Sequence, residues 1–164
     1  MTYKENRRWS DQYLPAIVQI IAPHLIQPAL FEYDVKQATD LMVLTGRDMR
    51  IAARVRRSNY AARYPYDFTI RSKHDNGAKT ELAKMLEGWG DWMFYGHADQ
   101  EQTGKLKRWM LIDLHKWRKK LLGEGYRDGW EHLAQSQSNG DGTHFMAFDV
   151  RKMPEVLIAS SSCD

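Results

Sequence analysis

The middle of the chain alternates between apolar and polar residues, which is the pattern of strands that bury one face. Residues 49–57 (MRIAARVRR) show it best, because arginines fill most of one face and apolar side chains fill the other, namely Met49, Ile51, Ala53 and Val55. The same pattern, or a short apolar run, predicts further strands over 66–72, 92–95, 108–114 and 144–150, with an edge element over 153–158.

Helical spacing marks the beginning of the chain. Residues 11–31 carry apolar side chains one turn apart, among them Ile17 and Ile21. Pro23 lacks a backbone N–H and disfavours a continuing helix. The pattern therefore predicts a helix over 11–22, followed by a bent or short second piece.

Two later segments also have helical character. Residues 78–87 predict a helix, and residues 115–122 predict a short basic helix. Residues 123–142 are rich in Gly and Ser and predict a long loop or a mixed segment.

A turn signal in the centre of the chain suggests how two strands pair. Residues 38–45 (ATDLMVLT) form a short apolar run, and Gly46, Arg47 and Asp48 follow it. We therefore expect 38–45 and 49–57 to form a β-hairpin. Together the elements predict an α+β (α/β-like) fold with a central mixed β-sheet of about five to six strands flanked by helices.

Length and composition set broad limits. The 164 residues predict a single domain over 1–164, with 1–10 as a loose basic leader and 159–164 as a flexible tail. The chain lacks the long apolar run of a membrane-spanning helix and an apolar secretory segment near its start. One cysteine, Cys163, excludes an intramolecular disulfide and a cysteine-built zinc site. These features favour a cytoplasmic protein without a membrane partner.

The distribution of charge suggests a nucleic-acid partner, DNA more readily than RNA. Between residues 47 and 73 there are eight Arg or Lys against two acids, and most of the eight are Arg, the side chain suited to phosphate. Tyrosines between them are candidates for stacking on bases. The predicted nucleic-acid contacts are Arg47, Arg50, Arg57, Arg63, Tyr60 and Tyr64. A solvated surface of an ordinary protein is the alternative interpretation.

Asp40 is the strongest candidate for chemistry. A carboxylate inside an apolar strand is costly unless it is paired, hydrogen-bonded or bound to a metal ion. Asp34 lies upstream and Glu81 lies on a predicted helix, so these carboxylates are candidate ligands for Mg²⁺, which prefers oxygen. The alternative is a cross-strand salt bridge from Asp40 to Arg54 or Arg56.

The order of elements resembles the PD-(D/E)XK nuclease fold, a restriction-endonuclease-like core. ATDLMVLTGRDMRIAARVRR resembles the hairpin that holds the site of that family. The resemblance implies that Asp40 and Glu81 bind Mg²⁺ with Asp34 or Asp91 as a helper, and that Arg54 and Arg56 contact the scissile phosphate. The second acid of the family motif is absent from its usual place, where this chain has Arg54-Val55-Arg56.

Three functions follow as hypotheses. The first is a metal-dependent endonuclease or a decayed relative of one. The second is a non-catalytic module of phage or mobile-element type that binds nucleic acid or protein. The third is a protein inhibitor or adaptor that uses an aromatic surface. The oligomeric state stays open, with a homodimer as one possibility. His97, at a predicted strand end, and His144 are the least ordinary of six histidines.

Overall fold

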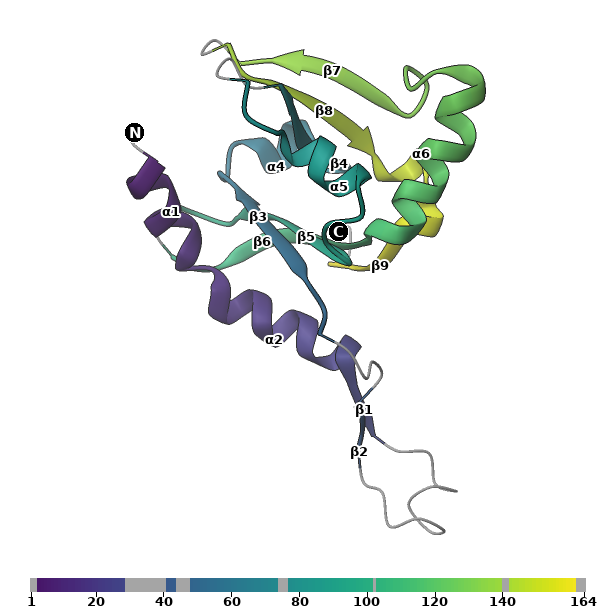
Figure 1. Ribbon diagram of the computed structural model, residues 1–164. Coiled ribbons are helices and arrows are strands. Elements are labelled where there is room, and N and C mark those ends of the chain that lie inside the picture. The colour runs from purple at the N-terminus through teal and green to yellow at the C-terminus, as the bar shows by residue number, and fades with distance from the viewer. Residues whose placement is uncertain are drawn as a thin grey trace, which may run out of the picture.

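The computed structural model describes residues 3–28, 41–43, 48–73, 77–101, 103–139 and 142–161. Within them the chain forms a mixed α+β structure whose two larger sheets have four and three strands (Figure 1). The strand order of the larger sheet is β3 (Ile51–Arg56), β5 (Trp92–Ala98), β6 (Leu106–Asp113) and β9 (Leu157–Ser160). β3 runs parallel to β5, whereas the other two pairings are antiparallel.

The smaller sheet is wholly antiparallel. Its order is β4 (Asp67–Lys73), β8 (His144–Asp149) and β7 (Ala134–Ser138). A separate antiparallel ladder joins β1 (Ile26–Pro28) to β2 (Leu41–Val43). Figure 1 shows this ladder extending away from both sheets.

The described helices lie around the sheets. They are α1 (Tyr3–Asp11), α2 (Leu14–Leu25), α4 (Tyr60–Arg63), α5 (Glu81–Leu86) and α6 (Leu114–Asp128), with short 3-10 turns η1 (Val150–Lys152) and η2 (Pro154–Val156). Local capping sets two of their starts. Thr80 accepts a hydrogen bond from the Ala83 N–H at 3.1 Å, and Asp113 accepts one from the His115 N–H at 2.8 Å. No helix in these parts of the chain is long and apolar enough to cross a membrane.

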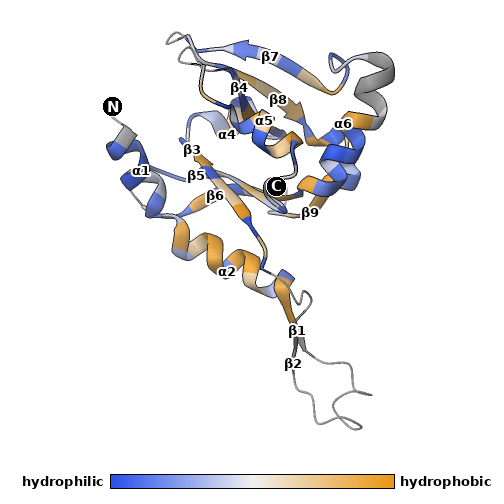
Figure 2. Cartoon of the chain, viewed as in Figure 1, coloured by the Kyte–Doolittle hydropathy of each residue, from blue (hydrophilic) through white to orange (hydrophobic). Residues whose placement is uncertain are grey.

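Two apolar cores lie on opposite faces of the four-stranded sheet. On one face α2, which is largely apolar (Figure 2), packs Ile17 and Ile21 against Val55, Phe94 and Leu111. On the other face the smaller sheet, α5 and α6 close a larger core. Its largest fully buried members are Trp117, Tyr95, Phe68, Phe148, Ile70 and Met93. The four-stranded sheet is therefore the middle layer of the molecule.

The alternating segments are strands, as predicted. β3, β4, β5, β6 and β8 fall on the five expected runs, and β9 begins within the expected edge element. Val55 is buried toward α2, and Arg54 lies on the opposite face. The alternation in MRIAARVRR thus reported the two faces correctly.

The expected hairpin is wrong for the described residues. β2 pairs with β1 rather than with β3, and β3 pairs in parallel with β5. The described strands are also divided between separate sheets, whereas we expected one central sheet. Alternation shows which face of a strand is buried but does not identify its neighbour, and for that reason the pairing was missed.

Three local expectations also need correction. The supposed loose leader is helical from Tyr3 onward in α1, and α2 continues past Pro23 to Leu25 although that proline has no N–H to donate to the preceding turn. The segment over 123–142, predicted as a long loop or a mixed segment, is mixed, because it contains the end of α6 and the polar strand β7. Part of the supposed tail belongs to β9, while 162–164 lie outside the described residues.

Candidate nucleic-acid interface

Two arginines of the candidate interface, Arg54 and Arg56, lie on β3. The edge position of this strand and its alternating sequence explain why they are there. β3 is at the edge of its sheet, paired with β5 alone among the described strands. Val55 enters the α2 core, so the neighbouring side chains Arg54 and Arg56 face the other way. Its register places Arg54 beside Tyr95 and Arg56 beside His97.

Arg54 connects three elements. Its Nη1 donates to the Thr69 carbonyl oxygen on β4 at 2.9 Å, and its Nη2 forms an ion pair with Glu81 at the start of α5. Glu81 also accepts a hydrogen bond from the Arg71 backbone N–H at 3.1 Å. The Arg54 and Glu81 side chains are 25% and 27% exposed. The structure therefore brings together two residues that the sequence assigned to one site.

Arg56 lies against an aromatic side chain instead. Its guanidinium carbon is 4.4 Å from the Tyr60 ring centroid, and it has no ion pair with a carboxylate among the described residues. α4 is a single turn, so Tyr60 and Tyr64 lie one above the other, with ring centroids 6.4 Å apart. The guanidinium of Arg63 lies 5.6 Å from the Tyr64 ring centroid. This end of β3 thus combines cations with stacked aromatic rings.

Arg57 extends the same pattern toward the N-terminal helix. Its guanidinium carbon lies 4.7 Å from the ring centroid of Trp9 on α1, and it forms an ion pair with Glu101. The contact between Arg57 and Trp9 therefore links α1 to the end of β3, and Trp9 also contacts Tyr13 edge-on, with ring centroids 5.1 Å apart.

A depression of about 750 Å³ lies between α1 and β3, and we call it the arginine groove. Five arginines line it, and they are Arg7, Arg54, Arg56, Arg57 and Arg71. Trp9 and Tyr60 contribute aromatic surface, and Asp11, which is 3.8 Å from Arg7, is the acid of its lining. The net positive charge of the groove comes mainly from Arg56 and Arg71, because the other three arginines are each paired with a carboxylate.

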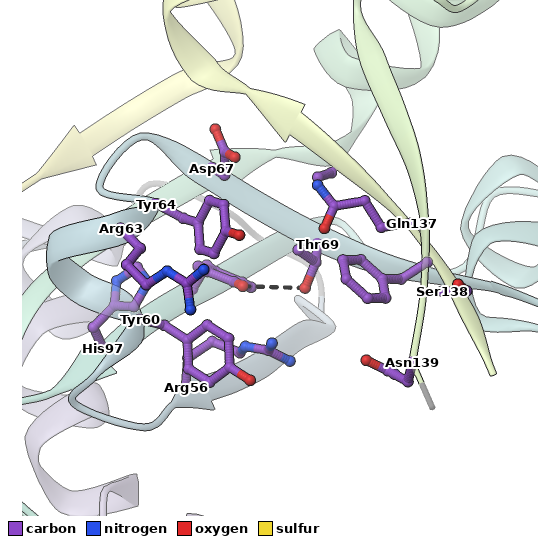
Figure 3. Close-up of a pocket in the computed structure, with 13 residues that line it drawn as sticks. Arg56, Tyr60, Arg63, Tyr64, Asp67, Thr69, His97, Gln137, Ser138 and Asn139 are labelled. Carbon is purple, nitrogen blue, oxygen red and sulfur yellow. Dashed lines mark hydrogen bonds between the residues drawn. The ribbon is translucent and has the colours of Figure 1, made fainter. Parts of the chain in front are cut away.

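A smaller cavity of about 210 Å³ adjoins the groove, and we call it the tyrosine pocket. Its aromatic lining is Tyr60, Tyr64, Tyr95 and Phe145, and its polar lining includes Thr69, His97, Gln137 and Asn139. Figure 3 shows Tyr60 and Tyr64 on one side, the two amide side chains on the other, and Thr69 between them. The Tyr95 and Thr69 hydroxyl oxygens are 3.1 Å apart, and burial raises the pKa of Tyr95.

His97 is the most deeply buried polar side chain of this pocket, ahead of Thr69. It is 1% exposed, and its Nδ1 has no hydrogen-bond partner in the part of the chain that the structure describes. The sheet register places it between Arg56 and Arg108. Burial first, and then these two cations, lower its pKa to about 4, so the imidazole is neutral near pH 7.

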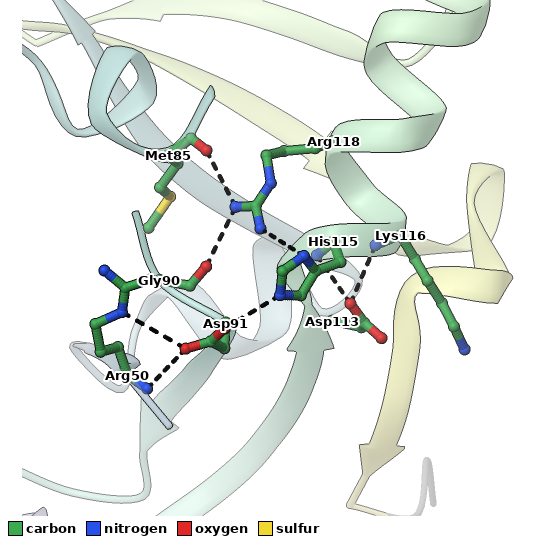
Figure 4. A network of polar contacts seen from close by, with 8 residues as sticks. All are labelled: Arg50, Met85, Gly90, Asp91, Asp113, His115, Lys116 and Arg118. Atoms are coloured by element: carbon green, nitrogen blue, oxygen red, sulfur yellow. Dashed lines mark hydrogen bonds and ion pairs between the residues drawn. The ribbon is translucent and has the colours of Figure 1, made fainter. Parts of the chain in front are cut away.

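Arg50 belongs to a different cluster, at the other end of β3 (Figure 4). Its backbone N–H donates to Asp91 at 2.9 Å, and its guanidinium lies 5.5 Å from the Trp89 ring centroid. A guanidinium can only donate, so Arg118 donates to Nδ1 of His115, at 3.0 Å. The imidazole proton is therefore on Nε2, which donates to the Asp91 carboxylate at 3.1 Å. Both nitrogens of that imidazole are engaged, which indicates a structural network rather than a catalytic base.

The predicted metal site lies largely outside the described residues. Two of its predicted ligands, Asp34 and Asp40, lie outside the described residues, so Glu81 is the described member of the metal set. The predicted nucleic-acid contact Arg47 also lies outside them. No group of three or more His, Cys, Asp or Glu side chains in the described ranges is arranged to hold a metal ion.

Sequence reasoning did not identify several lining residues. Arg71 was counted in the basic block but not selected, and Arg7 and Trp9 were placed in a loose leader. Gln137 and Asn139 lie in the segment predicted as a long loop or a mixed segment. They belong to or follow strand β7, whose polar sequence AQSQS has no alternation of apolar and polar residues to mark it as a strand.

Comparison with known proteins adds no assignment. No family model matches the chain, and no curated protein or solved structure shows significant similarity to it.

Proposed function

We propose that this protein binds nucleic acid, with the sugar-phosphate backbone lying in the arginine groove. The observation that carries the proposal is the gathering of five arginines from α1, from β3 and the residue after it, and from β4 along one depression that also contains Trp9 and Tyr60. Guanidinium groups bind phosphate through paired hydrogen bonds, and aromatic rings stack on bases.

Two arginines supply the strongest local argument. The guanidinium groups of Arg56 and Arg71 have no carboxylate partner within the described ranges, although both line the groove. A cation without a protein counter-ion is available to a phosphate group, and its binding releases counterions from the nucleic acid. DNA is the first ligand to test, with RNA as the comparison.

The test is fluorescence anisotropy of short labelled DNA, single-stranded and duplex, over a series of salt concentrations. We expect the logarithm of the affinity to fall linearly with the logarithm of the salt concentration. Arg71→Ala should reduce that slope by about 0.7 for single strands and about 0.9 for duplex. Lys119→Ala is the matched control, because Lys119 is an exposed cation on α6, away from the groove. Equal slopes for wild type and Arg71→Ala contradict the proposal.

A second candidate function is Mg²⁺-dependent hydrolysis of the phosphodiester on a restriction-endonuclease-like core. It is favoured by Glu81, a carboxylate that lies beside Arg54 on the arginine face of β3. Asp40 and Asp34 would complete the oxygen ligands of the metal ion, and Arg54 and Arg56 would contact the phosphate. When bound, Mg²⁺ would polarise the phosphate and activate water.

Glu81→Gln separates the two functions. It removes a negative charge beside the groove, so DNA affinity should stay the same or rise in either case. If the protein is a nuclease, cleavage of plasmid and single-stranded DNA with Mg²⁺ or Mn²⁺ should be lost in Glu81→Gln and in Asp40→Ala. Wild-type binding without cleavage indicates a non-catalytic binding module instead.

A further inference from the structure

We propose that the tyrosine pocket receives one unstacked base of a strand whose backbone lies in the arginine groove. The inference rests on the proposed nucleic-acid binding and adds to it a place for a single base. Proteins that act on or sense a base extrude it from the stack into a pocket that stacks on it.

The groove and the pocket are continuous. Arg56, Tyr60 and Asn139 line both of them. The Arg56 guanidinium lies 4.4 Å from the Tyr60 ring centroid, so a cation stands beside an aromatic ring at the junction. A phosphate bound at Arg56 would therefore place its attached nucleoside at the opening of the pocket.

The size and walls of the pocket suit one base. Its volume of about 210 Å³ is below the roughly 300 Å³ at which typical small-molecule sites begin. Tyr60, Tyr64 and Phe145 supply ring surfaces on which any base can stack.

Polar groups in the pocket match the edge of a base. Gln137 and Asn139 carry amides, and an amide has both a donor and an acceptor, as base edges do. Asn139 donates from Nδ2 to the Thr143 hydroxyl at 2.9 Å, and its oxygen points toward the pocket (Figure 3). The inner lining adds the neutral His97, whose buried Nδ1 lacks a partner among the described residues.

The experiment uses three labelled duplexes of one sequence, which are fully paired, carry one bulged adenine, or carry one bulged abasic site. Wild-type protein should bind the adenine bulge about tenfold more tightly than the abasic bulge, because one stacked base is gained. Tyr64→Ala should abolish that preference, and Tyr64→Phe should restore it.

Two further variants keep the test independent of folding. Gln137→Ala changes the outer strand of the smaller sheet and should also reduce the preference for the adenine bulge. Trp89→Ala removes an aromatic side chain that is 60% exposed and lines neither depression, so the preference should be unchanged.

The outcomes distinguish the two proposals. If wild type binds both bulges equally while Arg71→Ala still weakens binding, the base pocket is wrong and the groove stands. If no DNA or RNA binds at any salt concentration, both proposals are wrong.

Discussion

At the scale of single residues, the neutral imidazole of His97 makes the stability of the protein sensitive to acid. Its folded pKa of about 4 lies below the ordinary value of 6.5, so the unfolded chain binds the extra proton first. Stability should therefore be complete above about pH 6.5 and fall as the pH drops toward about 4, by up to about 3 kcal/mol.

Urea unfolding at a series of pH values measures this dependence. In His97→Asn the group that titrates is absent. The decrease in unfolding free energy that begins near the ordinary histidine pKa as the pH falls should therefore disappear. An unchanged pH dependence in His97→Asn contradicts the assignment. The duplex DNA of the binding assays should be omitted here, because a ligand stabilises the folded state.

Individual residues of the candidate site show how much could be predicted from the sequence. Glu81 and Arg54 could be assigned to one site, because a resemblance supplied their roles, and the structure brings them together. Asp40 lies outside the described residues, so its proposed cost in an apolar strand stays a prediction. His97 was noted for its place at a strand end, but its unpartnered nitrogen depends on packing between β3 and β6, which spacing does not reveal.

At the scale of elements, the strands that sequence predicted are those with one face in a core. β3, β5 and β8 bury apolar side chains on at least one face, and this burial produces the alternation that was read. β7 (AQSQS) buries only Ala134, so it carries no apolar signal, and the sequence predicts only a loop or a mixed segment there. Because β7 supplies Gln137, the missed strand hid one wall of the tyrosine pocket.

The pairing of the strands was also not predicted by the sequence. A turn signal at residues 46–48 predicts a local hairpin. Instead β3 pairs in parallel with β5, although 35 residues lie between the two strands, and Arg56 lies beside His97 in the register. A parallel pair needs a crossover, which here contains α4, β4 and α5. This crossover brings Thr69 and Glu81 to Arg54, so the long-range pairing builds the candidate site.

At the scale of the whole molecule, the two ends of β3 lie in different surroundings. One end opens on the arginine groove, and the other is held by Asp91, which is 2% exposed. Asp91 accepts hydrogen bonds from the Arg50 backbone and the His115 side chain, and its carbonyl oxygen accepts one from the Leu114 N–H at 3.0 Å. It therefore joins the starts of β3, β5 and α6 (Figure 4).

Asp91→Ala should consequently reduce stability without reducing DNA affinity. The change leaves the Arg50 N–H without its side-chain acceptor, which should cost about 1–3 kcal/mol of unfolding free energy. Asp113→Ala is the matched control, because it removes only the cap of α6 and should cost about 1 kcal/mol.

Arg50→Ala, measured by anisotropy beside Arg71→Ala, completes the comparison, since Arg50 does not line the groove. If Arg50→Ala lowers the salt slope as much as Arg71→Ala, the bound strand extends along the whole of β3 and the two ends share one task.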